Sequence, residues 1–295
     1  MTSIVCVKVL EGMILAADSA NLLSFATSQA SEQLYYNADK IFHLHPLLPI
    51  AAMTAGNSVI APMAPLPVVA PNVTSLSSAA SVVSLSRRLS LQLSGQDQDD
   101  DEPPFNINEF TVENVAERAS RLFAKACAKA QEDAQKNSWV FNVDLTYVVA
   151  GVSSGCNQTE AWLLTFQGAT FQPTPVAILG REEYGFKALG RSAPVYRLFD
   201  GFDPALRATL IAYEVDRQRP AKEAELMIDT LLRTFPVHPV APGMPLLDAS
   251  GLARFMVETT KGFERYTPGP DYVGGPIDMA SIDPYEGFRW ISRKH

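Results

Sequence analysis

The sequence predicts an α+β fold in which helices cover the outside of layered sheets. The expected elements come in groups along the chain: strands, then helices, then strands, then helices, and a final pair of strands. With 295 residues, of which 47% are hydrophobic and 19% charged, the chain is long enough to bury a large core. These two observations favour a globular protein with packed sheets.

The first expected element is a hairpin over residues 3–17. Residues 3–8 (SIVCVK) are mostly β-branched, Glu11 and Gly12 supply a turn, and residues 13–17 resume the apolar run. After a polar segment at residues 21–33, a second pair of strands is expected at residues 34–44 and 50–54. The turn-like HPLLP at residues 45–49 joins this pair.

Residues 62–110 differ from the rest of the chain in composition. Four prolines within residues 62–71 exclude a helix there, and a helix is expected to resume over residues 77–93. The run GQDQDDDEPP at residues 95–104 is typical of an acidic, solvated linker. We therefore expect one domain over residues 1–295, with an insertion and acidic linker at about residues 62–110.

A long helix is expected from residue 112 to about residue 136. Thr111 can cap it, although Asn114 stands where a full capping box has Glu or Gln. Strands at residues 143–151, 161–166 and 169–171 follow, and then helices at 204–217, 221–235 and 249–266. Within residues 274–282 a glycine turn feeds a strand, and a second strand at residues 288–291 completes the pattern.

Composition narrows the choice of partners and compartment. The formal net charge of −8 disfavours nucleic acid or an anionic membrane as main partner, since both would repel the protein. No run approaches the roughly 20 apolar residues that span a bilayer, and no signal-peptide pattern is indicated. Three widely spaced cysteines, Cys6, Cys127 and Cys156, fit reduced thiols in the cytoplasm.

Thr2 is the first candidate for chemistry. If Met1 is removed, Thr2 carries both a hydroxyl and a free α-amine, which makes it nucleophile and base in one residue. The alternative is that Thr2 is an ordinary strand residue. In that case Asp18 belongs to a strand-end turn and Lys40 is a solvent-facing strand lysine.

Five short sequence words carry a resemblance to a known family. They are TSIV (residues 2–5), GMILAADS (12–19), ADKIF (38–42), MTAG (53–56) and GGPID (274–278). With the order of elements, they resemble the proteasome β-subunit-like branch of the N-terminal nucleophile (Ntn) hydrolases. FERYTPG (263–269) and EGFRW (286–290) are similar to words of an uncharacterised bacterial proteasome-like family. The resemblance covers nearly the whole chain, except about residues 62–110 and an enlarged helical region before Gly274.

The resemblance implies a four-layer αββα sandwich and a threonine-type site. The Thr2 hydroxyl would attack a carbonyl while its own amine takes the proton, and a reference pKa of about 7.7 to 8.0 suits that amine to the task. Lys40 would discourage protonation of the amine, and Asp18 would hold the lysine. Gly56, at the end of a strand entering a helix, would present its N–H to the oxyanion.

Two parts of the family pattern are displaced in this sequence. The family's serine, in a Gly-Ser-Gly-like turn, faces Arg191, and Ser192 lies one position late. Its aspartate and serine before the Gly-Gly pair face Pro270 and Val273, which leaves Asp271 one residue out of register. Ser192 and Asp271 are therefore kept as additional candidates.

The resulting hypothesis is a proteasome-like threonine peptidase that assembles into a ring or another homo-oligomer and cleaves peptide or amide bonds. An amine acceptor in place of water would make the same site a transpeptidase. A rival hypothesis is a non-catalytic ring or scaffold subunit that has lost part of the site. The sequence does not identify the substrate, an unfoldase partner or the ring size.

No cofactor or metal is expected from the sequence. His43 and His45 have metal-compatible spacing but no third ligand word nearby. Gly274 and Gly275 lack the further glycine and the lysine of a phosphate loop.

Overall fold

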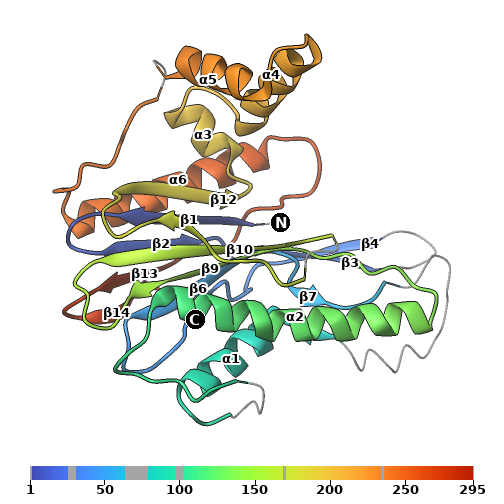
Figure 1. Cartoon of the computed structure of the whole chain (residues 1–295), viewed down its shortest axis with the longest axis vertical. Helices are drawn as coiled ribbons and strands as arrows, with labels where there is room; N and C mark the ends of the chain where they lie inside the picture. Colours follow the sequence, from blue (N-terminus) through green and yellow to red (C-terminus); the bar gives the residue numbers. More distant parts are fainter. Residues whose placement is uncertain are drawn as a thin grey trace.

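The computed structural model describes residues 2–25, 31–63, 79–97, 102–168, 171–233 and 236–294. Within these residues the chain forms two five-stranded antiparallel sheets, two short ribbons and six helices (Figure 1). The predicted α+β class is confirmed.

The first sheet is built around the N-terminal strand. This strand is β1 (Ser3–Lys8), and all six of its residues are buried. Ser3 pairs with Gly190 on one side of β1, and Ile4 pairs with Ala17 on the other. The predicted N-terminal hairpin is therefore confirmed. The strands are, in spatial order, β12 (Gly185–Gly190), β1 (Ser3–Lys8), β2 (Met13–Ala17), β13 (Asp278–Asp283) and β14 (Gly287–Ser292).

The second sheet has its longest strands at the centre and its shortest at the edges. Its order is β11 (Val176–Leu179), β10 (Thr159–Gln167), β9 (Asp144–Val152), β6 (Ile50–Gly56) and β5 (Ile41–His43). The two ribbons pair β3 (Asn21–Phe25) with β4 (Ser31–Tyr35), and β7 (Val59–Ile60) with β8 (Ala80–Ser81).

The helices are α1 (Val82–Leu93), α2 (Val112–Lys136), α3 (Ala193–Phe199), α4 (Pro204–Asp216), α5 (Ala221–Leu232) and α6 (Leu246–Arg265). The cap expected at the start of α2 is present, because Thr111 Oγ1 accepts the Asn114 N–H at 3.1 Å. This hydrogen bond satisfies one of the N–H groups that the first helical turn leaves without a partner.

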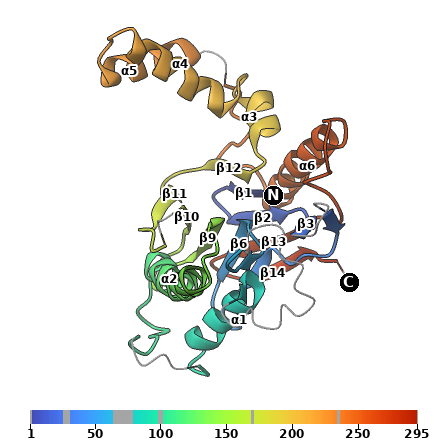
Figure 2. The same cartoon turned by 90° about the vertical axis from the view of Figure 1, so that its right-hand side faces the viewer.

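Three apolar clusters hold these elements together. One lies between the facing sides of the two sheets, and it includes Ile4, Leu15 and Met53. A second joins the outer face of the second sheet to α1 and α2, and a third joins the outer face of the first sheet to α3 and α6. Figure 2 shows α6 and α1–α2 on opposite sides of the sheets. Both faces of both sheets are thus covered, which explains why the central strands are apolar along their whole length.

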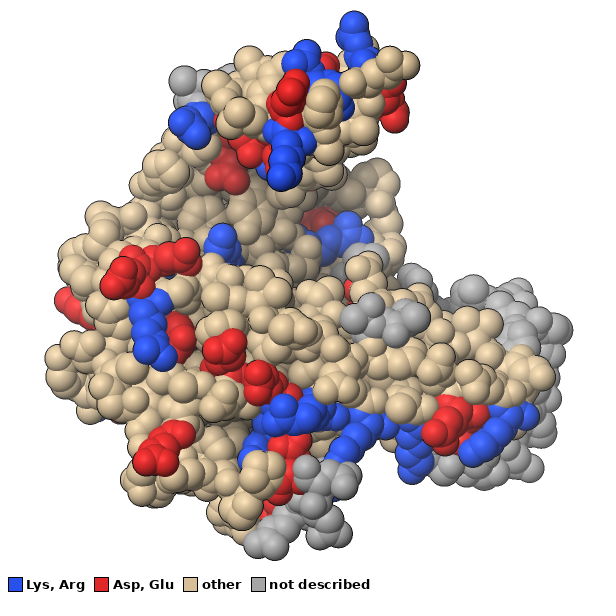
Figure 3. Space-filling model, viewed as in Figure 1, with Lys and Arg blue, Asp and Glu red and all other residues tan. Residues whose placement is uncertain are grey.

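The α4–α5 hairpin extends away from the sheets (Figures 1 and 2). Helix α4 has no buried residue, and only Ala224 and Ile228 are buried in α5. On the face seen in Figure 3, side chains of both charge signs are interspersed over this hairpin and along α2. No described helix is long and apolar enough to cross a membrane.

Several sequence predictions need correction. The polar segment at residues 21–33 contains the β3–β4 ribbon, and β11, β12 and α3 were not predicted. Phe171 lies outside any strand, and residues 169–170 lie outside the described residues. The same holds for residues 64–78 and 98–101 of the predicted insertion and linker, whereas α1, within that range, packs Val82 and Leu89 into the core. The single-domain assignment stays a prediction.

Candidate functional site

The buried carboxylate of Asp18 organises the site. Asp18 directly follows β2 and is 0% exposed. Its Oδ1 accepts the Ser3 N–H at 2.9 Å and Lys40 Nζ at 2.7 Å. Its Oδ2 accepts the N–H groups of Ala20 at 3.1 Å and of Gly274 at 3.0 Å. Four donors, three from the backbone, therefore fix this charge in place.

Lys40 is the cationic partner of Asp18. It precedes β5, it is 4% exposed, and its carbonyl accepts the Thr54 N–H at 3.0 Å. Among the described residues, Asp18 is the one hydrogen-bond acceptor of its ammonium. Burial lowers the pKa of Lys40 from its usual value, and the negative charge of Asp18 opposes that shift. A lysine in this position has N–H groups that can bind a further acceptor.

Thr2 lies one residue from this ion pair and is 3% exposed. Its carbonyl accepts the Arg191 N–H at 2.7 Å. Gly190 has a φ of +76°, and a Cβ on it would lie 2.0 Å from the Thr2 carbonyl oxygen and 3.3 Å from Ala55 Cβ. The end of β12 thus lies against Thr2 and near the end of β6, at a distance that only glycine permits.

Gly56 ends β6 with a φ of +98°. A Cβ there would lie 2.2 Å from the Asp144 carbonyl oxygen, and the Asn57 N–H donates to that same oxygen at 2.8 Å. The chain leaving β6 thus stays bonded to the start of β9 at Asn57 and then forms strand β7. The expectation that Gly56 enters a helix is wrong, because this backbone pairing leads the chain into a strand.

Arg191 occupies the position where the family pattern has a serine. Its Nη1 lies 3.6 Å from Oε1 of the buried Glu264, and its guanidinium lies 4.5 Å from the centre of the Tyr272 ring. The side chain connects the turn after β12 with α6 and with the segment before β13.

Ser192 and Asp271 are not brought into the Asp18–Lys40 network. Ser192 precedes α3 and its hydroxyl makes no capping hydrogen bond. Asp271 is half-buried, and within the described part of the chain no hydrogen bond or ion pair joins it to Asp18 or Lys40. The structure therefore brings together Thr2, Asp18 and Lys40, while roles for Ser192 and Asp271 rest on the sequence pattern alone.

Sequence reasoning missed two other contributors. Gly274 was identified only as part of a turn, yet its N–H binds Asp18. Lys294 was not considered, although it forms ion pairs with Asp39 and Asp278 beside Lys40. The Gly274–Asp18 and Lys294–Asp39 contacts join residues about 250 positions apart, and no local pattern marks them.

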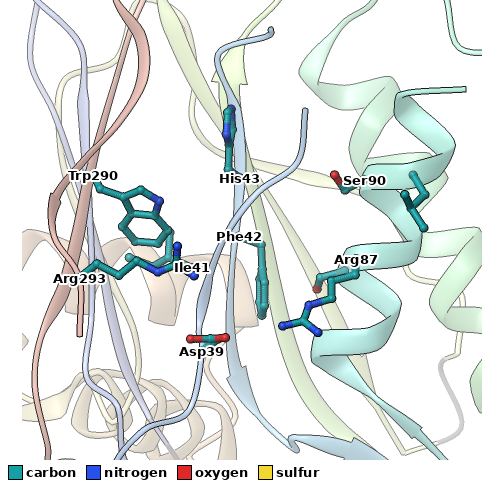
Figure 4. Close-up of a pocket in the computed structure, with 10 residues that line it drawn as sticks. Asp39, Ile41, Phe42, His43, Arg87, Ser90, Trp290 and Arg293 are labelled. Carbon is teal, nitrogen blue, oxygen red and sulfur yellow. The ribbon is translucent and has the colours of Figure 1, made fainter. Parts of the chain in front are cut away.

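A cavity of about 460 Å³ lies beside this network, between β5, α1 and the end of β14. Figure 4 shows Trp290 and Arg293 on one side of it, Arg87 and Ser90 of α1 on the other, and Phe42 between them. The cavity is an open space lined by aromatic and cationic side chains.

Comparison with solved structures shows the fold. The helical assembly of the Anbu complex from Pseudomonas aeruginosa is similar to this chain, with a TM-score of 0.54 and 13% identity over 99% of this chain and 88% of that one. Anbu (ancestral beta-subunit) from Yersinia bercovieri is similar with a TM-score of 0.50, 13% identity and the same coverage. The fold is Anbu-like. It is therefore a proteasome-related fold, and at this identity the likeness extends to the fold alone.

The family assignment made from the sequence needs correction. No family model matches the chain, and no curated protein matches it. The predicted placement among the Ntn hydrolases, closest to an uncharacterised bacterial proteasome-like family, is replaced by a fold-level similarity to Anbu. The sequence words were misleading because a buried strand that ends in a tight turn favours apolar residues followed by Asp, Ser or Gly, whatever the family.

Proposed function

We propose that this protein cleaves peptide or amide bonds with Thr2 as the nucleophile, after Met1 has been removed. The observation that carries the proposal is the double use of Asp18 Oδ1, which binds both the Ser3 N–H and Lys40 Nζ. One carboxylate oxygen thus fixes the residue next to Thr2 and a buried ammonium.

In the proposed reaction, Thr2 Oγ1 bonds to the carbonyl carbon of the substrate while the Thr2 amine takes the hydroxyl proton. The carbon–nitrogen bond then breaks, and that proton passes to the departing amine. Water attacks the resulting ester and releases the acid, which restores the hydroxyl. No cofactor takes part in this scheme.

The other site residues act on charge and position. The Lys40 ammonium favours the neutral, proton-accepting form of the Thr2 amine, because like charges repel. Asp18 holds Lys40 in place. Gly56 N–H is proposed to stabilise the oxyanion, and such a donor is worth about 100- to 1000-fold in rate. Its support is the proximity of the end of β6 to Thr2 through Gly190.

The mass of the purified protein is the first test, since retained Met1 blocks the amine. The second test is reaction with a peptide epoxyketone, which requires both the hydroxyl and the free amine of an N-terminal threonine. We expect one adduct on Thr2 and none on Thr2→Ala, together with loss of peptide hydrolysis in that variant. Absence of the adduct from protein that lacks Met1 would contradict the proposal.

A second candidate function is that of a non-catalytic subunit. It is favoured by Arg191, which stands in the place of a serine and contacts Glu264 and Tyr272. If no adduct forms, the non-catalytic subunit is favoured.

Transpeptidation is the alternative for an active site. It is favoured over hydrolysis if the adduct forms but no amide is cleaved in a broad peptide panel, or if an amine acceptor is needed.

We further propose that the chain is one domain with the four-layer αββα arrangement, that it is cytoplasmic, and that it assembles with copies of itself. The covered faces of both sheets support the first, and the free Cys6, Cys127 and Cys156 support the second. The helical assembly of the similar Anbu complex supports self-association. So do the exposed apolar side chains of the α4–α5 hairpin, among them Tyr213 and Leu226.

A further inference from the structure

Lys294, which follows β14, lies next to the segment that carries Lys40. Its ammonium donates to the Ala38 carbonyl at 2.8 Å, lies 3.2 Å from Asp39 Oδ1 and forms an ion pair with Asp278. The Lys294 N–H donates to the other oxygen of Asp278 at 2.8 Å. Lys294 therefore ties the two residues before Lys40 to strand β13.

The contact with Asp278 is buried, whereas the Asp39 side chain is 34% exposed. The Lys294 side chain is 8% exposed and that of Asp278 is 3% exposed. Removing one partner of a buried ion pair leaves the other charge without compensation. The Lys294–Asp278 pair holds its geometry better than an exposed pair, because little water reaches its charged groups.

The same contacts connect to Asp18. Asp278 pairs with Ala17 in β2, the residue immediately before Asp18. The Ala38 N–H donates to the Ser19 carbonyl at 3.0 Å. The segment before Lys40 is thus held next to both chain neighbours of Asp18. Ala38 bonds directly to Ser19, and Lys294 links Ala38 to Asp278, which pairs with Ala17.

We propose that Lys294 is a positioning residue for the proposed Thr2 site. It holds residues 38–39 against β13 so that the Lys40 ammonium meets Asp18 beside Thr2. The assignment of a role in catalysis rests on the proposed function, whereas the positioning of Lys40 can be measured without it.

The charged groups that face Lys40 are Asp18 after β2, Asp278 in β13 and Lys294 after β14, with Asp39 beside it in the chain. The positive charge of Lys294 lowers the pKa of Lys40, and the negative charge of Asp278 raises it. Replacing Lys294 by methionine removes the first influence and leaves Asp278 without its cation. Both changes raise the pKa of Lys40 whether or not its ammonium moves, so the position of Lys40 is read separately.

The first test is NMR of the lysine ammonium groups, with Lys40 assigned by its loss in Lys40→Arg. The hydrogen bond to Asp18 protects the Lys40 ammonium protons from exchange with water. We expect this protection to be lost in Lys294→Met and to return in Lys294→Arg. The matched control is Arg289→Met, which removes a cation of β14 whose ion pair with Glu286 is exposed. Unchanged protection in folded Lys294→Met would overturn the proposal. If Lys294→Met does not fold, Lys294→Gln replaces it.

The second test is the rate of epoxyketone adduct formation on Thr2 as a function of pH. We expect Lys294→Met to react about 10-fold more slowly at its optimum, with the alkaline limb of its profile moved to higher pH. Lys294→Arg and Arg289→Met should both react at close to the wild-type rate. A lower rate with an unmoved alkaline limb indicates a structural role only and contradicts positioning. If wild type forms no adduct, the proposed function fails, and the proton exchange of the Lys40 ammonium still decides whether Lys294 positions Lys40.

Discussion

Strand β1 has a buried lysine near each of its ends, and the two lysines are bonded differently. At the far end, Lys8 is 1% exposed, and its ammonium donates to the carbonyls of Gly180 and Arg181 and lies 5.3 Å from the centre of the Tyr184 ring. At the near end, Lys40 has a carboxylate as its one hydrogen-bond acceptor in the described part of the chain.

The carboxylates near the two lysines also differ in their hydrogen-bond partners. Near Lys8, Glu160 is hydrogen-bonded by Ser153, Trp162 and Arg181, so that carboxylate has partners other than the lysine. Near Lys40, the aspartate binds the lysine directly and also fixes the Ser3 N–H. The first arrangement ties strands together, and in the second the lysine meets a carboxylate that also holds the residue after Thr2. Burial of a lysine therefore indicates a site only when its bonding is incomplete.

The largest expected effect is that of Lys40→Ala. We expect hydrolysis and adduct formation to fall by about 1000-fold or more, because the charge that keeps the Thr2 amine neutral is lost. Lys8→Met, which removes the other buried lysine of the pair, should leave the rate of adduct formation within about twofold of wild type. Circular dichroism checks that both variants are folded. Undiminished turnover in folded Lys40→Ala would contradict the site.

The second comparison uses the glycines at the two ends of β12. A Cβ on Gly190 meets the Thr2 carbonyl oxygen at 2.0 Å, so Gly190→Ala must displace Thr2. We expect the adduct rate to fall by about 100-fold, since a displacement of about 1 Å has such effects. Gly185 has a φ of +144° and nothing within 4 Å of an added Cβ, so Gly185→Ala should cost about 1–3 kcal/mol of stability from the backbone alone and leave the rate unchanged. Equal rates of adduct formation in Gly190→Ala and Gly185→Ala would show that the reaction does not depend on the position of Thr2.

The smallest effect concerns stability at alkaline pH. Burial lowers the pKa of Lys8 from 10.5 to about 8, against the opposing charges of Glu160 and Glu183. Between these two values the unfolded chain binds more protons than the folded one, so the free energy of unfolding rises with pH by about 3 kcal/mol from this group. Urea unfolding of wild type and Lys8→Met at pH 7.5 and pH 10.5 measures the difference. Lys222→Met, at an exposed position of α5, is the control and should retain the full rise.

The sequence predicts the parts of this site that local patterns determine. Residues 3–17 alternate and turn as a hairpin does, and this alone places Thr2 and Asp18 at neighbouring strand ends. Lys40 was found through the Ile41-Phe42 pair that follows it and begins β5. The environment of Gly56 was not predicted, because it depends on Asp144, 88 residues later in the chain. The Lys294 contacts and strand β12 were missed for the same reason, since only tertiary packing determines them.

The burial of Thr2 also sets an order of events during synthesis. In the folded chain Thr2 is 3% exposed, and β12 and β13, which close the sheet around the first hairpin, begin only at residues 185 and 278. At about 5–20 residues per second, a ribosome needs roughly 10–40 s to reach β12. If Met1 is removed, as the proposed function requires, an aminopeptidase would therefore act within that interval, while the nascent strand still lacks its second neighbour. The late position of β12 in the chain gives the enzyme that time.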